Sequence, residues 1–201
     1  MDPTLLNTLT DLGDSALMLP LAVMLAVVLW SQQSAAAALT WLGTLVPGLI
    51  AITVLKLAGH ACEAALASPG LVSPSGHAAF AAMVYGGAAV VVARHTGGPP
   101  RWVTGLAAGG LVATVAASRL LLGAHSVPEV VVGLLIGGAT VLLFGRAYRR
   151  LPPATLRSRG MVALAGAAAL LVVAMHGERL HAEELIRTIA AGLRTQISAC
   201  R

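Results

Sequence analysis

Charged residues are scarce in this chain: Asp, Glu, Lys and Arg together make up 10% of its 201 residues, whereas 57% are hydrophobic. A soluble domain normally carries about 25% charged residues, so this composition argues against one. Uncharged runs of about 20 residues are typical of helices that cross a bilayer. The run from Ser15 to Leu55 contains no charge and is long enough for two such helices.

Aromatic residues and cysteines are also few, and each scarcity excludes a class of site. Aromatic residues make up 3% of the chain, so the surfaces that stack nucleic-acid bases are lacking, and we expect no nucleic-acid partner despite the net charge of +5. The two cysteines, Cys62 and Cys200, are too few and too far apart for a disulfide framework or a zinc site. No basic residue precedes Lys56, so we expect no cleaved signal peptide.

The hydrophobic runs predict an all-α, polytopic membrane protein with six transmembrane helices in a bundle. Polar segments and segments rich in glycine and proline separate the runs. Gly105-x-x-x-Gly109 and Gly133-x-x-x-Gly137 offer small faces at which helices can pack closely. The predicted spans are Ser15–Trp30, Ala36–Leu57, Pro74–Ala93, Trp102–Leu121, Ser126–Phe144 and Met161–Met175.

Six spans place both termini, the second-to-third loop and the fourth-to-fifth loop on one side of the membrane. All eight acidic residues lie on this side: Asp2, Asp11, Asp14, Glu63, Glu129, Glu178, Glu183 and Glu184. The opposite side carries arginines and no acid: Arg94, Arg101, Arg146, Arg149, Arg150, Arg157 and Arg159. The positive-inside rule assigns the arginine side to the cytoplasm. In a bacterial inner membrane, which the Ala- and Gly-rich composition favours, the acidic side and both termini then face the periplasm or exterior.

Both ends of the chain show amphipathic patterns. Leu5, Leu6, Leu9 and Leu12 recur at nearly helical spacing, and a predicted C-terminal helix at about 178–199 carries a stripe of Leu185, Ile189, Leu193 and Ile197. Each segment can lie along the membrane surface or pack against the rim of the bundle. No internal repeat or second domain is evident, so we expect one membrane-embedded domain over 1–201, with its core motifs in 56–129.

The segment Ser73-Pro74-Ser75-Gly76-His77 predicts an anion site at the start of the third span. Ser73 is a good helix cap and Pro74 a good first helical residue. The free N–H groups of a helix start attract anions, Gly76 allows close approach, and the hydroxyl of Ser75 adds a donor. His77 then lies where it can protonate a leaving oxygen. The plainer interpretation is a capped helix with an interfacial histidine.

A second cluster comprises Ser118-Arg119, His125 and Glu129. The guanidinium of Arg119 suits phosphate oxygens, although an arginine at this depth can also simply extend to the membrane surface. His125 and Glu129 are one helical turn apart, so the carboxylate can fix the imidazole tautomer and leave the other nitrogen nucleophilic. Ser126-Val127-Pro128-Glu129 also fits a capping box, which would make Glu129 structural. A shared role is open.

The single lysine, Lys56, ends the second span, and His60 lies one turn beyond it. By itself Lys56 fits a membrane anchor and His60 a solvated loop residue. Together with the two clusters above, both can contribute to a phosphate site.

These residues, taken in order, resemble the motifs of the type 2 phosphatidic acid phosphatase superfamily: Lys56, then the segment that ends at His77, then Ser118-Arg119-x5-His125-x3-Glu129. These integral-membrane lipid phosphate phosphatases share their core with vanadium haloperoxidases. The resemblance implies that His125 is a nucleophile that forms a phosphohistidine and that His77 is the general acid. It implies that Lys56, Ser75, Gly76 and Arg119 hold the phosphoryl oxygens, and that no metal or other cofactor is needed.

Two positions depart from the pattern of that family. Its first motif has Arg-Pro seven residues after the lysine, where this chain has Glu63 and Ala64. We expect His60 to replace the missing cation in part. The family's final Asp is Glu129, which can also accept a hydrogen bond from an imidazole N–H.

The expected function is therefore a membrane phosphatase acting on a lipid phosphate or diphosphate, such as polyprenyl diphosphate or phosphatidylglycerol phosphate, at the periplasmic face. A vanadate-dependent peroxidase is a rival with the same core, but the missing arginine and the membrane spans argue against it. A non-catalytic lipid-phosphate binder or transporter that retains the pocket is a rival of another class, and Glu63 favours it.

Overall fold

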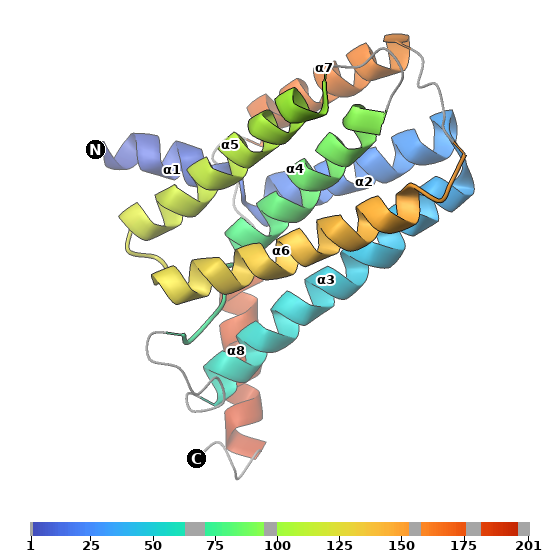
Figure 1. Ribbon diagram of the computed structural model, residues 1–201. Helices are drawn as coiled ribbons and strands as arrows, with labels where there is room; N and C mark the ends of the chain where they lie inside the picture. Colours follow the sequence, from blue (N-terminus) through green and yellow to red (C-terminus); the bar gives the residue numbers. More distant parts are fainter. Residues whose placement is uncertain (1, 63–70, 95–99, 153–157, 176–181, 197–201) are drawn as a thin grey trace.

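The structure is a computed structural model of the chain and describes all residues except 1, 63–70, 95–99, 153–157, 176–181 and 197–201. The described residues form eight α-helices and no strand (Figure 1), which confirms the all-α prediction. The helices are α1 (Pro3–Asp11), α2 (Ser15–Gln32), α3 (Ala35–Ala61), α4 (Gly76–Arg94), α5 (Arg101–Leu121), α6 (Val127–Tyr148), α7 (Ser158–Ala174) and α8 (Ala182–Gln196).

Five helical stretches among the described residues are long and apolar enough to cross a membrane. They are Thr4–Gln32, which joins α1 and α2, and the helices α3, α4, α5 and α6. Large apolar side chains on these helices point outward, as lipid-facing residues do, among them Val23, Leu39, Leu106 and Leu135. The pattern indicates a multi-pass membrane protein.

The predicted sixth span corresponds to α7, whose length leaves the span count open. This helix has 17 residues, and at about 1.5 Å per residue it extends roughly 25 Å, less than the ~30 Å of a typical hydrocarbon core. The six-span count therefore stays a prediction.

α4 lies at the centre of the bundle, where it packs between α5 and α6 and also contacts α2 and α3. Small side chains on α4 and α6 permit this close approach. A Cβ added to Gly133 would lie 2.5 Å from the carbonyl oxygen of Ser75, and one added to Gly137 would lie 2.6 Å from that of Ala79. The close contact expected of the Gly133-x-x-x-Gly137 pair is present; at Gly105 and Gly109 an added Cβ would meet no described atom within 4 Å.

Trp41 anchors the interior of the bundle. Its side chain is fully buried, its indole N–H donates to the carbonyl of Ala22 at 3.0 Å, and its ring packs edge-on against Phe144. A Cβ on Gly87 of α4 would meet the Trp41 ring at 2.4 Å, so only glycine leaves room for the ring there. This packing joins α2, α3, α4 and α6 and fixes the relative positions of their ends.

The two terminal helices pack on the bundle: α1 on α5, and α8 along α3. In α1, Leu6 is buried and Leu5 is exposed. In α8, Ala190 is buried, whereas Leu185 and Ile189 of the predicted stripe are exposed. Ile197 lies outside the described residues. A position along the membrane surface stays a prediction for both helices.

Cys62, the residue that follows α3, is disulfide-bonded. The chain's other cysteine, Cys200, lies outside the described residues. The sequence argument against a disulfide framework did not foresee this single bond.

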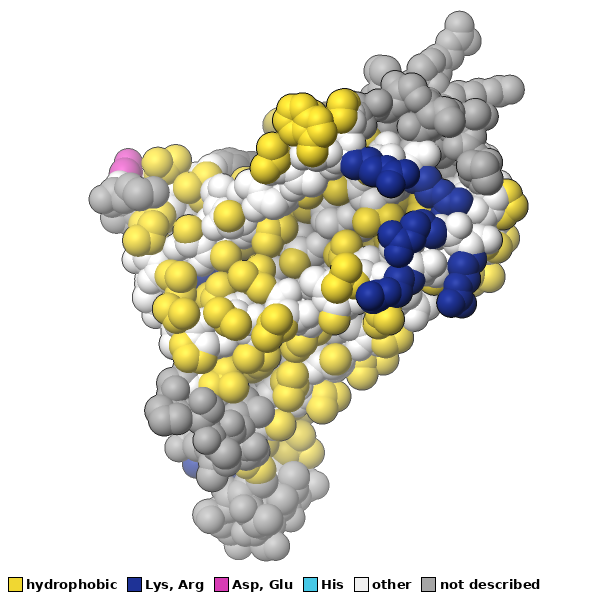
Figure 2. All heavy atoms as spheres, in the orientation of Figure 1, with side chains coloured by type: hydrophobic (Ala, Val, Ile, Leu, Met, Phe, Trp, Pro, Cys, Tyr) yellow, Lys and Arg dark blue, Asp and Glu magenta, His cyan; other side chains and the backbone are white. Residues whose placement is uncertain are grey.

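Arginines gather at one end of the molecule, over the ends of α4 and α6 and the start of α5 (Figure 2). The motif residues lie at the other end, where α3 and α5 finish and α4 and α6 begin. The bundle therefore separates an arginine-rich end from the end that carries the candidate site.

Candidate active site

The segment 73–77 forms the turn that leads into α4. Ser75 is the residue just before the helix, and its Oγ accepts a hydrogen bond from the N–H of Ala78 at 3.4 Å. The prediction that Ser73 caps the helix and Pro74 begins it is therefore wrong. Ser75 is fully buried, and its hydroxyl retains a proton to donate.

Glu129 of α6 binds this turn, and its hydrogen bonds explain why α4 begins at Gly76 and not at Pro74. Its Oε1 accepts hydrogen bonds from the N–H groups of Ser73 at 2.7 Å and Val72 at 3.1 Å, and its main-chain carbonyl accepts one from Ser75 at 2.9 Å. These bonds hold the N–H groups of Val72, Ser73 and Ser75 in a turn, so the helix begins at Gly76 and not at Pro74. They join residues more than 50 positions apart, so local sequence does not reveal them.

The other carboxylate oxygen of Glu129 serves two further groups. It accepts a hydrogen bond from the N–H of Ser126 at 3.0 Å, which completes the capping box, and it lies 3.0 Å from Nδ1 of His125. The two interpretations of Glu129 are therefore not exclusive: one carboxylate caps α6 and orients the histidine.

His125 is thereby placed as a buried, oriented imidazole. Because a carboxylate accepts only, Nδ1 carries the proton and Nε2 keeps its lone pair. Burial lowers the pKa of His125; the bond to Glu129 opposes this effect, while the charges of Lys56 and Arg119 lower the pKa further. The net lowering favours a neutral, nucleophilic ring at neutral pH.

The end of α5 brings His125 back toward Arg119. Gly123 adopts a φ of 63°, a left-handed conformation that glycine adopts without strain. The N–H groups of Ala124 and His125 then donate to the carbonyl of Arg119, at 3.1 and 3.3 Å. The spacing between the arginine and the histidine thus corresponds to a helix end followed by a tight reversal.

Arg119 contacts the N-terminal helix. Its Nη1 donates to Oγ1 of Thr10, a buried residue of α1, at 3.0 Å. The adjacent Ser118 is buried, and its hydroxyl donates to the carbonyl of Val115 at 2.7 Å, so it stabilises its own helix. Arg119 is the member of this pair whose predicted role in anion binding stays a prediction.

Lys56 and His60 lie on consecutive turns of α3 and share one partner, Glu183 of α8. The ammonium of Lys56, with 5% of its side chain exposed, lies 2.5 Å from Oε2 of Glu183. Nε2 of His60 lies 3.2 Å from Oε1 of the same carboxylate. Lys56 also donates to the carbonyl of Pro74 at 3.4 Å, which ties it to the turn before α4.

The Glu183 carboxylate is held in its ionised form. Burial raises its pKa, but the charge of Lys56 and the hydrogen bonds from Lys56 and His60 outweigh that effect, so the pKa lies below its usual value. An anionic side chain therefore already occupies the position between Lys56 and His60.

His77 has an acidic partner as well. Its Nε2 lies 3.3 Å from Oδ2 of Asp14, a buried residue that also caps α2 by accepting from the N–H of Ala16 at 2.8 Å. The carboxylate orients the ring through Nε2, which leaves Nδ1 as the nitrogen available to another partner.

A cavity of about 240 Å³ opens between α2, α3, α4 and α8. Its polar part is formed by Asp14, Lys56, Gly76, His77 and Glu183, and its apolar part includes Leu19, Leu49, Phe80 and Ile186. A Cβ on Gly76 would lie 3.9 Å from Nζ of Lys56, an ordinary van der Waals distance, so the lysine lies directly beside the start of α4.

The cavity brings together four of the residues expected from sequence: Lys56, Gly76, His77 and, through Glu183, His60. Ser75, Arg119, His125 and Glu129 do not line it; hydrogen bonds and electrostatic interaction with Lys56 connect them to it. Glu63 and Ala64 lie outside the described residues.

Sequence reasoning missed Thr10, Asp14 and Glu183. Each comes from a segment outside the motifs. For Asp14 the signal was its position as a helix cap; for Glu183 it was its place on an acidic helix start opposite a lone lysine.

The model of the PAP2 superfamily matches residues 63–153, which contain the turn before α4, Arg119, His125 and Glu129. No curated protein and no solved structure matches the chain. The matched segment coincides with the part in which a carboxylate, an imidazole and a helix start are joined by hydrogen bonds. The match confirms the resemblance seen in the motifs: residues 63–153 of the chain are similar to the PAP2 superfamily.

Proposed function

We propose that the protein is a membrane phosphatase that hydrolyses a lipid phosphate or diphosphate through a phosphohistidine on His125. The observation that carries the proposal is the 3.0 Å contact between Nδ1 of His125 and the Glu129 carboxylate. It orients a buried, neutral imidazole beside two cations, Lys56 and Arg119, whose charges act on it. A nucleophile next to fixed positive charge is the arrangement that phosphoryl transfer requires.

In the first step, Nε2 of His125 attacks phosphorus while the bond to the lipid oxygen breaks. The His77 imidazolium gives its proton to that oxygen, so the lipid leaves as a neutral alcohol, or as a monophosphate from a diphosphate. Lys56, Arg119, the N–H groups around Gly76 and the hydroxyl of Ser75 stabilise the phosphoryl oxygens. In the second step, water attacks the phosphohistidine, His77 takes up a proton, and inorganic phosphate is released.

Glu183 occupies the place that a phosphoryl oxygen would take between Lys56 and His60. A substrate phosphate must therefore displace this carboxylate, and α8 must yield or rotate the side chain. His60, on the turn after Lys56, then supplies a second donor to the phosphate and replaces in part the arginine that the family has at the position of Glu63.

The cavity supports a lipid as substrate because its polar floor continues into an apolar wall. A phosphate at Lys56 and His77 places the attached chain against Leu19, Leu49 and Ile186. We propose polyprenyl diphosphate, phosphatidylglycerol phosphate or a similar bacterial lipid, with no metal or other cofactor.

We further propose that the active site faces the periplasm and that both termini are outside. The arginine-rich end then lies in the cytoplasm, as the positive-inside rule requires (Figure 2). The disulfide at Cys62, at the end that carries the active site, supports this orientation because disulfides persist in oxidising compartments.

A phosphate-release assay of the purified protein on a panel of lipid phosphates tests the proposal. Turnover that is lost in His125→Ala, with the variant still folded, is the expected result. The contact between Glu183 and Lys56 favours a second candidate, a lipid-phosphate binder without turnover. Binding of the lipids with no phosphate released from any of them would establish the binder and refute the phosphatase.

A further inference from the structure

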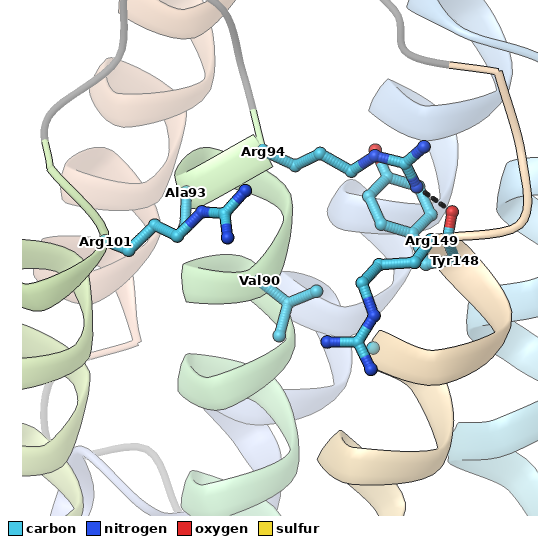
Figure 3. Close-up of a pocket in the computed structure, with 7 residues that line it drawn as sticks. Val90, Ala93, Arg94, Arg101, Tyr148 and Arg149 are labelled. Carbon is cyan, nitrogen blue, oxygen red and sulfur yellow. Dashed lines mark hydrogen bonds between the residues drawn. The ribbon is translucent and has the colours of Figure 1, made fainter.

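A second cavity, of about 290 Å³, lies at the end of the bundle opposite His125 (Figure 3). Arginines from three helices surround it: Arg94 at the end of α4, Arg101 at the start of α5 and Arg149 just after α6. Its floor includes Val90 and Ala93. No acidic residue lies in the chain between Glu63 and Glu129 or between Glu129 and Glu178, so the loops at this end supply no counter-charge.

The three arginines differ in what they bind. Both terminal nitrogens of Arg94 donate to main-chain carbonyls, those of Tyr148 and Leu151, and its guanidinium lies 4.9 Å from the centre of the Tyr148 ring. Arg94 therefore holds the end of α6 in place. No hydrogen bond or ion pair joins the side chains of Arg101 and Arg149 to another described residue, and both side chains line the cavity.

An apolar groove of about 470 Å³ continues from this cavity along α5. The two hollows share Val90, Ala93 and Arg101. The groove reaches Val112, eleven residues beyond Arg101, which is about 16 Å along a helix and roughly half of a ~30 Å hydrocarbon core. Added Cβ atoms at Gly105 and Gly109 would meet nothing within 4 Å, so the glycines leave open space rather than a helix contact.

We propose that this composite hollow binds an anionic phospholipid from the leaflet at the arginine end. The phosphate lies between Arg101 and Arg149, whose planar guanidinium groups suit its oxygens, and one acyl chain lies in the groove. Basic pockets between transmembrane helices bind anionic headgroups in this way. The positive charge of the arginines complements an anionic headgroup, and the groove extends through about one leaflet, as an acyl chain does. No described histidine lines the hollow, so the lipid is bound and not hydrolysed.

The headgroup contact is tested by native mass spectrometry of the full chain, purified in a zwitterionic detergent and titrated with phosphatidylglycerol, phosphatidylcholine or inorganic phosphate. We expect retention of phosphatidylglycerol over phosphatidylcholine, and loss of at least about ten-fold in affinity in Arg101→Gln/Arg149→Gln, the scale of one charge-assisted hydrogen bond. The matched control is Arg146→Gln/Arg150→Gln, which removes the same charge from the same end without touching the cavity.

An equal loss of affinity in both double variants would overturn the proposal, because phosphatidylglycerol would then bind to the general surface charge and not to this cavity. Inorganic phosphate that competes fully with phosphatidylglycerol at equal concentration would overturn the lipid and leave an anion site. These measurements do not involve turnover, so their result is independent of the phosphatase proposal.

The acyl-chain contact is tested by filling the groove. Gly109→Leu places a side chain in the open space and is expected to weaken phosphatidylglycerol binding several-fold. Gly110→Leu is the control, because Gly110 is equally free of neighbours but does not line the groove. Unchanged binding in Gly109→Leu would overturn the groove. Should that variant not fold, Gly105→Leu tests the same space.

Discussion

The Glu183 carboxylate and the Lys56 ammonium lie 2.5 Å apart although they are far apart in the sequence. Their contact links the C-terminal helix to the position where the proposed phosphatase must bind phosphate. A carboxylate in contact with a lysine and a histidine resembles a bound phosphate in charge and in hydrogen-bond acceptors. In the structure, the Glu183 carboxylate therefore occupies the position that we propose for the phosphate.

Glu183→Gln is expected to strengthen phosphate binding. Its pKa is lowered, so Glu183 is ionised at neutral pH and well below, and it competes with phosphate across the physiological range. Because its side chain is 42% exposed, we expect the Kd for orthovanadate or phosphate to fall by about three- to ten-fold, roughly 0.7–1.4 kcal/mol. Isothermal titration measures this change.

Glu184→Gln is the matched control, because this exposed neighbour removes the same charge from the same helix. It should leave phosphate binding unchanged. Weaker binding in Glu183→Gln would show that the carboxylate instead positions Lys56 and His60 for the substrate.

The pH dependence of turnover should reflect the lowered pKa of His125. The neutral ring is the nucleophile, so activity is lost as pH falls through its pKa, and the acidic limb should lie below the usual value of about 6.5. Arg119→Gln removes one charge that lowers this pKa and should move the acidic limb to higher pH while reducing the rate. An acidic limb that stays in place in Arg119→Gln would contradict the electrostatic coupling.

Glu129→Gln should impair both turnover and stability. The amide keeps one acceptor oxygen but cannot serve Val72, Ser73, Ser126 and His125 together. Hydrogen bonds to a charged group contribute roughly 1.5–3 kcal/mol each, so we expect the free energy of unfolding to fall by about 2 kcal/mol or more. Denaturant titration in detergent measures this loss. A fully active but destabilised variant would show that Glu129 acts only on the helix and the turn.

Asp14→Asn separates the two roles of Asp14. Asparagine caps a helix as well as aspartate does, so α2 should keep its stability. The charge beside His77 is lost, and we expect a larger drop in rate for a lipid phosphate, whose leaving group needs a proton, than for an aryl phosphate, whose leaving group does not. Equal drops for both substrates would indicate that His77 only positions the phosphate.

The orientation proposal predicts which engineered cysteines react from outside. In spheroplasts, an impermeant maleimide should label Glu184→Cys and spare Arg150→Cys until the membrane is opened. The chain without either substitution provides the background. The reverse pattern would place the active site in the cytoplasm.

The sequence predicted the helices well because hydrophobic runs and the helix breakers between them are local features. The fourth span, expected at Trp102–Leu121, is α5 at Arg101–Leu121. The start of α4 was misplaced because a distant carboxylate, Glu129, binds the turn and overrides the local capping preference of Ser73. Local rules therefore fail where a tertiary contact competes for the same backbone groups.

The candidate site was predicted as far as its motifs extend. His125 and Glu129 could be paired from their i, i+4 spacing, whereas Lys56 and His77 were expected at the same end from the predicted spans and from the resemblance. Glu183 and Asp14 could not, since they reach the site through the packing of α8 on α3 and of α2 beside α4. That packing determines that Glu183 contacts Lys56 and that Asp14 contacts His77.

The hydrogen bonds of Glu129 also bear on how the candidate site unfolds. One side chain bonds to the turn before α4, to the first residue before α6 and to the imidazole, so none of these can separate without disturbing the others. We therefore expect the motifs to open together as a single cooperative unit. Slow hydrogen exchange at the N–H groups of Ser73 and Ser126 should therefore be lost together, at the same temperature at which the catalytic geometry disappears.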